Sequence, residues 1–233
     1  MIPKRAVLAC SIVLIATWGL LGIGKWIVPL IPGVWASVDS IDYQLKYQIT
    51  TALFAIVVLL ILRQLRPLQF AAYARVGTIQ APAEANRFFG IAAGESWKKV
   101  GITLSILITV VTAVVIWGQA VNGHTLQPST LLILWVPFFA AVNAAVEEGL
   151  TRLGVVVAFA DVLPASRIVL ISGGVFGSVH YFGHPGGFVG VLVAGILGWV
   201  LARSVLETRG MFWAWWIHFL QDIIILGALF AAR

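Results

Sequence analysis

The sequence AAVEEGLTRLG (residues 144–154) places two adjacent carboxylates, Glu147 and Glu148, and the guanidinium of Arg152 inside an apolar segment at about 131–160. A helix needs about 17–25 residues to cross a bilayer, so this segment is long enough to span a membrane. Ionisable side chains are unfavourable in hydrocarbon and by default mark a functional site. The stretch therefore predicts a membrane helix and a site within it.

Composition extends this prediction to the whole chain. Hydrophobic residues make up 61% of the 233 residues, charged residues make up 10%, and the mean hydropathy is +1.00. Soluble domains are about 45–50% apolar and about 25% charged. We therefore expect an integral, multi-pass membrane protein whose partner is the lipid bilayer and not a nucleic acid. The single cysteine, Cys10, excludes a disulfide within the chain.

Several apolar segments are long enough to cross a bilayer as helices. Together they predict an all-α transmembrane bundle of about seven spans (eight possible), in one domain that covers residues 1–233. The segments lie at about 6–24, 44–62, 100–120, 131–160, 166–183, 188–206 and 210–230.

The distribution of basic residues predicts the orientation. The loop at about 63–99 is the only sizeable extramembrane piece, and it holds six Lys or Arg residues against two Glu residues. Because cytoplasmic loops carry an excess of Lys and Arg, we expect this loop and the amino terminus to be cytoplasmic and the carboxyl terminus to lie outside. This orientation puts eleven of the 15 basic residues on the cytoplasmic side.

Six ionisable residues lie inside the later segments, and we expect them to share one cavity because buried charges need partners or water. The fourth and fifth segments form a hairpin whose turn is centred between residues 163 and 164, which places Glu147 beside His180. The shallower position of His218 in the seventh segment puts the site within the membrane, nearer the cytoplasm. The six residues are Glu147, Glu148, Arg152, His180, His218 and Asp222.

Helical spacing separates the roles of the two adjacent carboxylates. Glu148 precedes Arg152 by four residues, the favourable order for an ion pair on one helix face. Glu147 points about 100° away from Glu148, so it is free for chemistry. His218 and Asp222 are also four apart, and such a pair can ligate a metal together or hold one oxygen atom of a substrate.

Three motifs in this order resemble those of the CPBP or ABI family of intramembrane proteases, which includes the Ras-converting CAAX endopeptidase. They are EEGLTR (147–152), FGSVH (176–180) and HFLQD (218–222), and they fall within residues 144–222. The resemblance implies an intramembrane endopeptidase that cleaves a membrane-associated peptide or a prenylated protein.

The resemblance also implies roles for individual residues. Glu147 would activate a water molecule as general base, with His180 beside it. His218 and Asp222 would bind a metal or stabilise the oxyanion. The residues expected to give structural support are Glu148, Arg152 and Phe176.

The resemblance leaves two mechanisms open, because the family is often described as metalloproteases while a metal-free glutamate mechanism has also been argued. Asp222 stands where the CAAX enzyme has Asn, and a carboxylate is a better ligand for a cation and a poorer partner for an oxyanion. This difference favours a divalent metal, with zinc as the first expectation and His180, His218, Asp222 and Glu147 as its ligands.

Other functions are compatible with the same residues. A proton-coupled transporter could use the Glu, His and Asp cluster as a relay, although no inverted repeat or pair of broken helices supports it. A haem protein could use His180 and His218 as axial ligands, but carboxylates beside the haem would be unexpected. A purely structural polar cluster is the remaining alternative.

Overall fold

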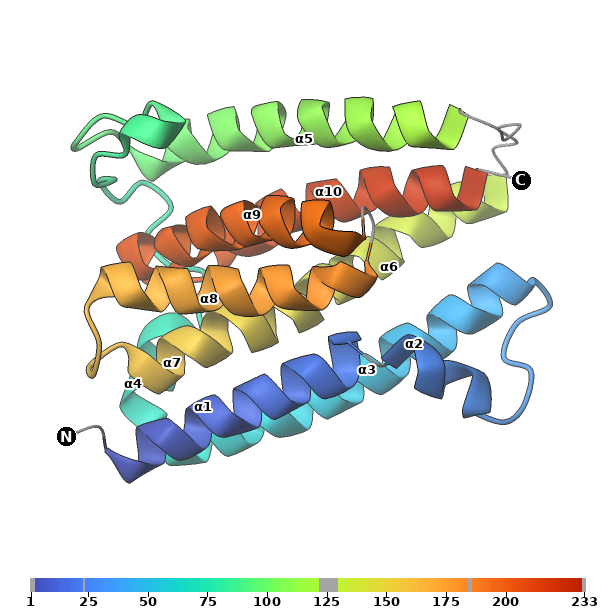
Figure 1. The fold of residues 1–233 in the computed structure, drawn as a ribbon, viewed down its shortest axis with the longest axis horizontal. Coiled ribbons are helices and arrows are strands. Elements are labelled where there is room, and N and C mark those ends of the chain that lie inside the picture. The colour runs from blue at the N-terminus through green and yellow to red at the C-terminus, as the bar shows by residue number, and fades with distance from the viewer. Residues whose placement is uncertain (1–2, 23, 122–129, 184–185, 232–233) are drawn as a thin grey trace.

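The computed structural model describes residues 3–22, 24–121, 130–183 and 186–231. Within these ranges the regular elements are helices and no β-strand is present, which confirms the all-α class; the long helices run along one axis (Figure 1). The α-helices are α1 Lys4–Thr17, α2 Gly24–Ile27, α3 Asp39–Leu65, α4 Pro67–Tyr73, α5 Trp97–Val121, α6 Thr130–Glu148, α7 Val155–Phe159, α8 Ala165–Val179, α9 Gly187–Thr208 and α10 Phe212–Ala231. The π-helical and 3-10 elements are η1 Trp18–Gly22, η2 Val28–Leu30, η3 Arg87–Phe89, η4 Gly149–Gly154 and η5 His180–Phe182.

The seven segments predicted from the sequence are helical, but not all of them meet the limits for a membrane span. The fourth is divided into α6, η4 and α7 and carries three charged side chains, and the fifth, α8, has only 15 residues. Within the described part of the chain, five helices are long and apolar enough to cross a membrane. They are Lys4–Leu21, Asp39–Leu65, Trp97–Ile116, Gly187–Thr208 and Phe212–Ala231.

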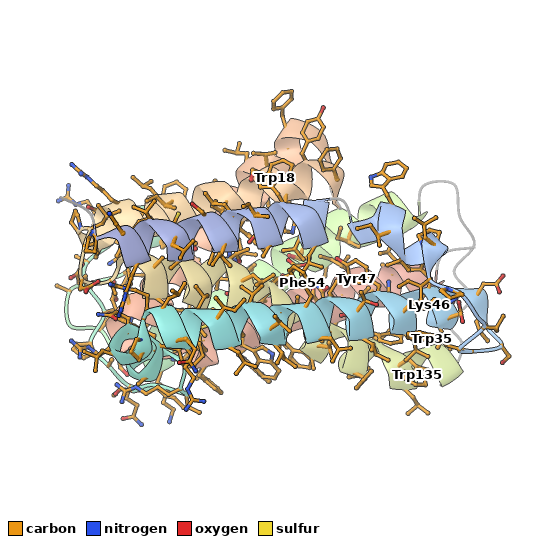
Figure 2. All side chains as sticks on the ribbon, turned by 90° about the horizontal axis from the view of Figure 1, so that it is seen from below. Trp18, Trp35, Lys46, Tyr47, Phe54 and Trp135 are labelled. Carbon is orange, nitrogen blue, oxygen red and sulfur yellow. The ribbon has the colours of Figure 1, made fainter. Side chains whose placement is uncertain are left out.

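The flanks of the bundle are apolar and exposed. Leu53 on α3 is 62% exposed, Val114 on α5 is 69% exposed and Leu192 on α9 is 64% exposed. Figure 2 shows carbon-rich side chains along α1 and α3 and nitrogen-bearing side chains gathered at the end of the bundle near α4. Such a surface matches hydrocarbon and is unfavourable in water, so the chain is an integral membrane protein. The two termini lie at opposite ends of the bundle (Figure 1), and which end is cytoplasmic stays a prediction.

The basic loop is tied to the helices that carry the site. The Arg66 guanidinium pairs with Asp161 in the turn after α7, and its Nε donates to the carbonyl oxygen of Val157 at 3.3 Å. At the other end of the loop, Trp97 Nε1 donates to Glu207 Oε2 on α9 at 2.7 Å. These contacts fix the turn of the α7–α8 hairpin and the end of α9 against the same loop.

Glycines let α8 and α9 pack at backbone distance. A Cβ atom on Gly173 would lie 2.8 Å from the carbonyl oxygen of Gly195, and a Cβ on Gly177 would lie 2.5 Å from the carbonyl oxygen of Val191. Small residues at helix interfaces are the usual means of close packing in membranes, where lipid tails are as apolar as leucine. This contact holds the carboxyl end of α8, where His180 follows, against α9.

We expect Gly177→Ala to lower the free energy of unfolding by about 1–3 kcal/mol, the usual cost of overpacking, because Val191 meets the new methyl group with backbone and cannot turn aside. Thermal unfolding in detergent micelles measures the effect. Gly174→Ala is the matched control, since a Cβ there meets no atom within 4 Å. Equal melting temperatures for the two variants would contradict the packing argument.

Candidate active site

Helix α6 becomes π-helical directly after the two adjacent carboxylates, over Gly149–Gly154. A π segment breaks the regular hydrogen-bond ladder and is frequent at functional sites. Hydroxyl groups bond to carbonyl oxygens here, since Thr151 Oγ1 donates to the Glu147 carbonyl and Ser172 Oγ donates to the Thr151 carbonyl, both at 2.6 Å. Such bonds satisfy backbone groups that hydrocarbon cannot. The second of them also ties α8 to η4 beside Glu147.

Three helices bring one carboxylate and two imidazoles together. Glu147 is at the end of α6, His180 directly follows α8, and His218 is on α10. Glu147 Oε2 lies 4.0 Å from His180 Nε2 and 3.7 Å from His218 Nε2. Glu147 is 12 residues, or about 18 Å, from the end of α7 and about 26 Å from the start of α6. The cluster therefore lies inside the bundle, nearer the end that carries the basic loop.

Hydrogen bonds fix which ring nitrogen of each histidine faces Glu147. His180 Nδ1 lies 2.8 Å from the carbonyl oxygen of Phe176, and a carbonyl can only accept, so Nδ1 carries the hydrogen. His218 Nδ1 lies 2.7 Å from Glu148 Oε1 and donates to that carboxylate. Both Nε2 atoms are thereby directed toward the carboxylate of Glu147.

The three residues expected to give structural support surround these histidines. Arg152 Nη2 lies 2.9 Å from Glu148 Oε1, and both side chains are fully buried. The Arg152 guanidinium also stacks over the Phe176 ring at 3.8 Å, and this ring contacts the rings of His180 and His218. Glu148 thus does more than pair with Arg152, because it holds His218 directly.

Asp222 and a residue outside the sequence motifs complete the polar cluster. Asp222 Oδ1 lies 3.5 Å from His218 Nε2. Asn143 Nδ2 lies 3.0 Å from Asp222 Oδ2 and 3.0 Å from Glu147 Oε1. The sequence motifs did not single out Asn143. Its position four residues before Glu147, on one face of an apolar helix, was the available signal.

Comparison with known families found one match, and its range includes these residues. Residues 128–224 match the family model described as type II CAAX prenyl endopeptidase Rce1-like. This segment is similar to the Rce1-like family. The matched range contains all three motifs, so the resemblance predicted from them is confirmed. No curated protein and no solved structure matches the chain. The family description implies a protease.

The expected zinc site fits the Rce1-like segment by ligand type but not by geometry. Imidazole and carboxylate are both zinc ligands, and a tetrahedral ion with bonds of about 2.0–2.2 Å holds its ligand atoms about 3.4 Å apart. The facing nitrogen and oxygen atoms here are 3.5, 3.7 and 4.0 Å apart. In the part of the chain that the structure describes, no group of three or more His, Cys, Asp or Glu side chains could hold a metal ion. Zinc stays a prediction.

Two cavities meet at Glu147 and His180. One, of about 240 Å³, lies between α5, α9 and α10, and its walls are mainly apolar side chains such as Val115, Val193 and Leu197. The other, of about 330 Å³, lies between α3 and η5 and includes tyrosine and glutamine side chains of α3. Tyr47, labelled on α3 in Figure 2, lines this second cavity. The polar cluster thus adjoins an apolar space on one side and a more polar space on the other.

Proposed function

We propose that the protein is an intramembrane endopeptidase that hydrolyses a peptide bond in a membrane-associated substrate, using a water molecule activated by Glu147. The Rce1-like match favours a protease over a proton-coupled transporter. The observation that carries the proposal is the free oxygen of Glu147. Its Oε2 is buried and has no hydrogen-bond partner among the described residues, and it faces the Nε2 atoms of His180 and His218.

A buried carboxylate oxygen without a protein partner calls for a water or a substrate group. The gap of 4.0 Å between Glu147 Oε2 and His180 Nε2 suits one bridging water, which can form a hydrogen bond of about 2.8 Å with each atom. Both atoms are acceptors when His180 is neutral, because the ring hydrogen is on Nδ1. The water would donate one hydrogen to each of them and direct a lone pair toward the substrate.

The oxygen of this water attacks the carbonyl carbon of the peptide bond, and its proton passes to Glu147 Oε2. His218 in its protonated form donates from Nε2 to the oxyanion that forms, and the carboxylates of Glu148 and Asp222 balance its charge. When the carbon–nitrogen bond breaks, Glu147 returns the proton to the leaving nitrogen. The products are a carboxylic acid and an amine, and Glu147 is again ionised.

The surroundings suit a substrate with an apolar part. The cavity between α5, α9 and α10 is mainly apolar and reaches Glu147 and His218, so it can receive hydrocarbon next to the scissile bond. The family description names prenylated CAAX substrates. We therefore choose a prenylated CAAX peptide as the first substrate to test, with a transmembrane peptide as the second.

We expect the purified protein in lipid nanodiscs to cleave a quenched prenyl peptide or a transmembrane peptide. Treatment with a zinc chelator and elemental analysis decide between the two mechanisms, because activation of the water by Glu147 without a metal predicts cleavage that persists after chelation and less than one metal ion per chain. Loss of cleavage on chelation, with recovery on adding zinc, would show that the attacking water is bound to a metal and is not activated by Glu147 alone. No cleavage of either peptide, together with proton-coupled transport, would overturn the proposal.

A further inference from the structure

We propose that Asn143 is a positioning residue that sets which oxygen of Glu147 activates the water and holds Asp222 toward His218. Its Nδ2 is 3.0 Å from Glu147 Oε1 and 3.0 Å from Asp222 Oδ2. The inference rests on the proposed function, because it assigns a role within the same reaction.

The amide of Asn143 can bridge Glu147 and Asp222 because it carries one hydrogen for each acid. An Asn amide nitrogen carries two hydrogens, and an ionised carboxylate oxygen can only accept. One hydrogen therefore serves Glu147 and the other serves Asp222. The reverse orientation of the amide would place its oxygen against two carboxylate oxygens, which is repulsive. The NH2 group must face the two acids.

In each of the two acids, Asn143 forms a hydrogen bond with one carboxylate oxygen and leaves the other oxygen to face the histidines. In Glu147, Oε1 is bonded to Asn143 and Oε2 is left facing the two Nε2 atoms. In Asp222, Oδ2 is bonded to Asn143 and Oδ1 faces His218 Nε2 at 3.5 Å. Because small displacements at a reacting centre are costly, a donor that fixes both carboxylates supports kcat more than substrate binding.

Asn143 also offsets the repulsion between the two acids. Glu147 and Asp222 come from α6 and α10 and are both at least nine-tenths buried. Like charges repel strongly where water is scarce. A shared donor between them lets both carboxylates point into one site, so removing it should let them move apart and carry Oε2 away from His180.

The test compares Asn143→Leu and Asn143→Ser with the wild-type protein in the nanodisc cleavage assay. Leu has a similar volume and no donor, so we expect kcat to fall about 10–100-fold, the usual effect of removing a partner that orients a site residue, while KM stays within about threefold. Ser carries one donor hydrogen and can serve one acid, so its kcat should be intermediate. It also keeps the test valid if the Leu variant does not fold.

Gln69→Leu is the matched control. Gln69 is an amide on α4 whose Nε2 donates to Asp161 Oδ2 at 2.9 Å, outside the polar cluster. Wild-type kcat in both Asn143 variants would overturn the positioning role, and so would an equal loss of kcat in Gln69→Leu. If Glu147→Gln is inactive while Asn143→Leu is fully active, only this inference fails. If Glu147→Gln keeps full activity, the proposed function fails with it.

Discussion

Glu147→Gln is expected to lower kcat for peptide hydrolysis by about 10²- to 10⁴-fold, the usual contribution of a positioned general base. Gln keeps the length of the side chain, and its amide oxygen can still accept the hydrogen bond from Asn143. The group that replaces Oε2 is then an NH2, which cannot take a proton from water. Steady-state kinetics on the quenched peptide, with KM determined separately, measure the effect.

The control for this substitution is Glu84→Gln. Glu84 is a carboxylate in the basic loop whose side chain is 82% exposed, so the same change of charge occurs far from the bundle interior. Its kcat should equal that of the wild-type protein. If the polar cluster were purely structural, Glu147→Gln would lower the melting temperature and leave the kcat of the folded fraction unchanged. That result would contradict the general-base role.

Much of the fold was predictable because its cause is local. Apolar runs of helix length predicted each of the seven helical segments, and the hairpin register predicted the pairing of Glu147 with His180, which lie 4.0 Å apart. Antiparallel helices joined by a short turn have a register fixed by counting residues from that turn. The number of spans was less predictable. The π-helical break after Glu148 and the end of α8 at Val179 depend on packing that periodicity does not describe.

The contacts within the cluster were only partly predictable. Spacing of four residues indicated the pair of Glu148 with Arg152, which the structure contains at 2.9 Å. The bond between Glu148 and His218 joins residues 70 positions apart, and it depends on how α6 and α10 are rotated about their axes. Helical spacing within one element carries no information on that rotation. Tyr47 on α3 was missed for the same reason.

The Arg152 variant gives the largest expected change in stability. Arg152→Met removes the guanidinium 2.9 Å from the buried Glu148 carboxylate and leaves that carboxylate with His218 alone, and breaking a buried ion pair costs about 3–5 kcal/mol. Thermal and denaturant unfolding of the detergent-solubilised protein measure the loss. A melting temperature equal to that of the wild-type protein would show that the pair contributes nothing, and would contradict the prediction.

A double variant separates the structural role of this pair from its role at the site. Replacing both charges by apolar side chains of similar volume, as in Glu148→Leu with Arg152→Met, is expected to recover most of the lost stability, because no unpaired charge remains. Catalysis should not recover, since Glu148 also accepts the hydrogen bond from His218 Nδ1 at 2.7 Å. Without that acceptor the ring of His218 can rotate and loses an anion that balances its charge, so the Nε2 donor to the oxyanion is no longer held in place. A double variant that is stable and fully active would mean that Glu148 serves the fold alone. A double variant that is stable and inactive is the expected result if Glu148 also orients His218.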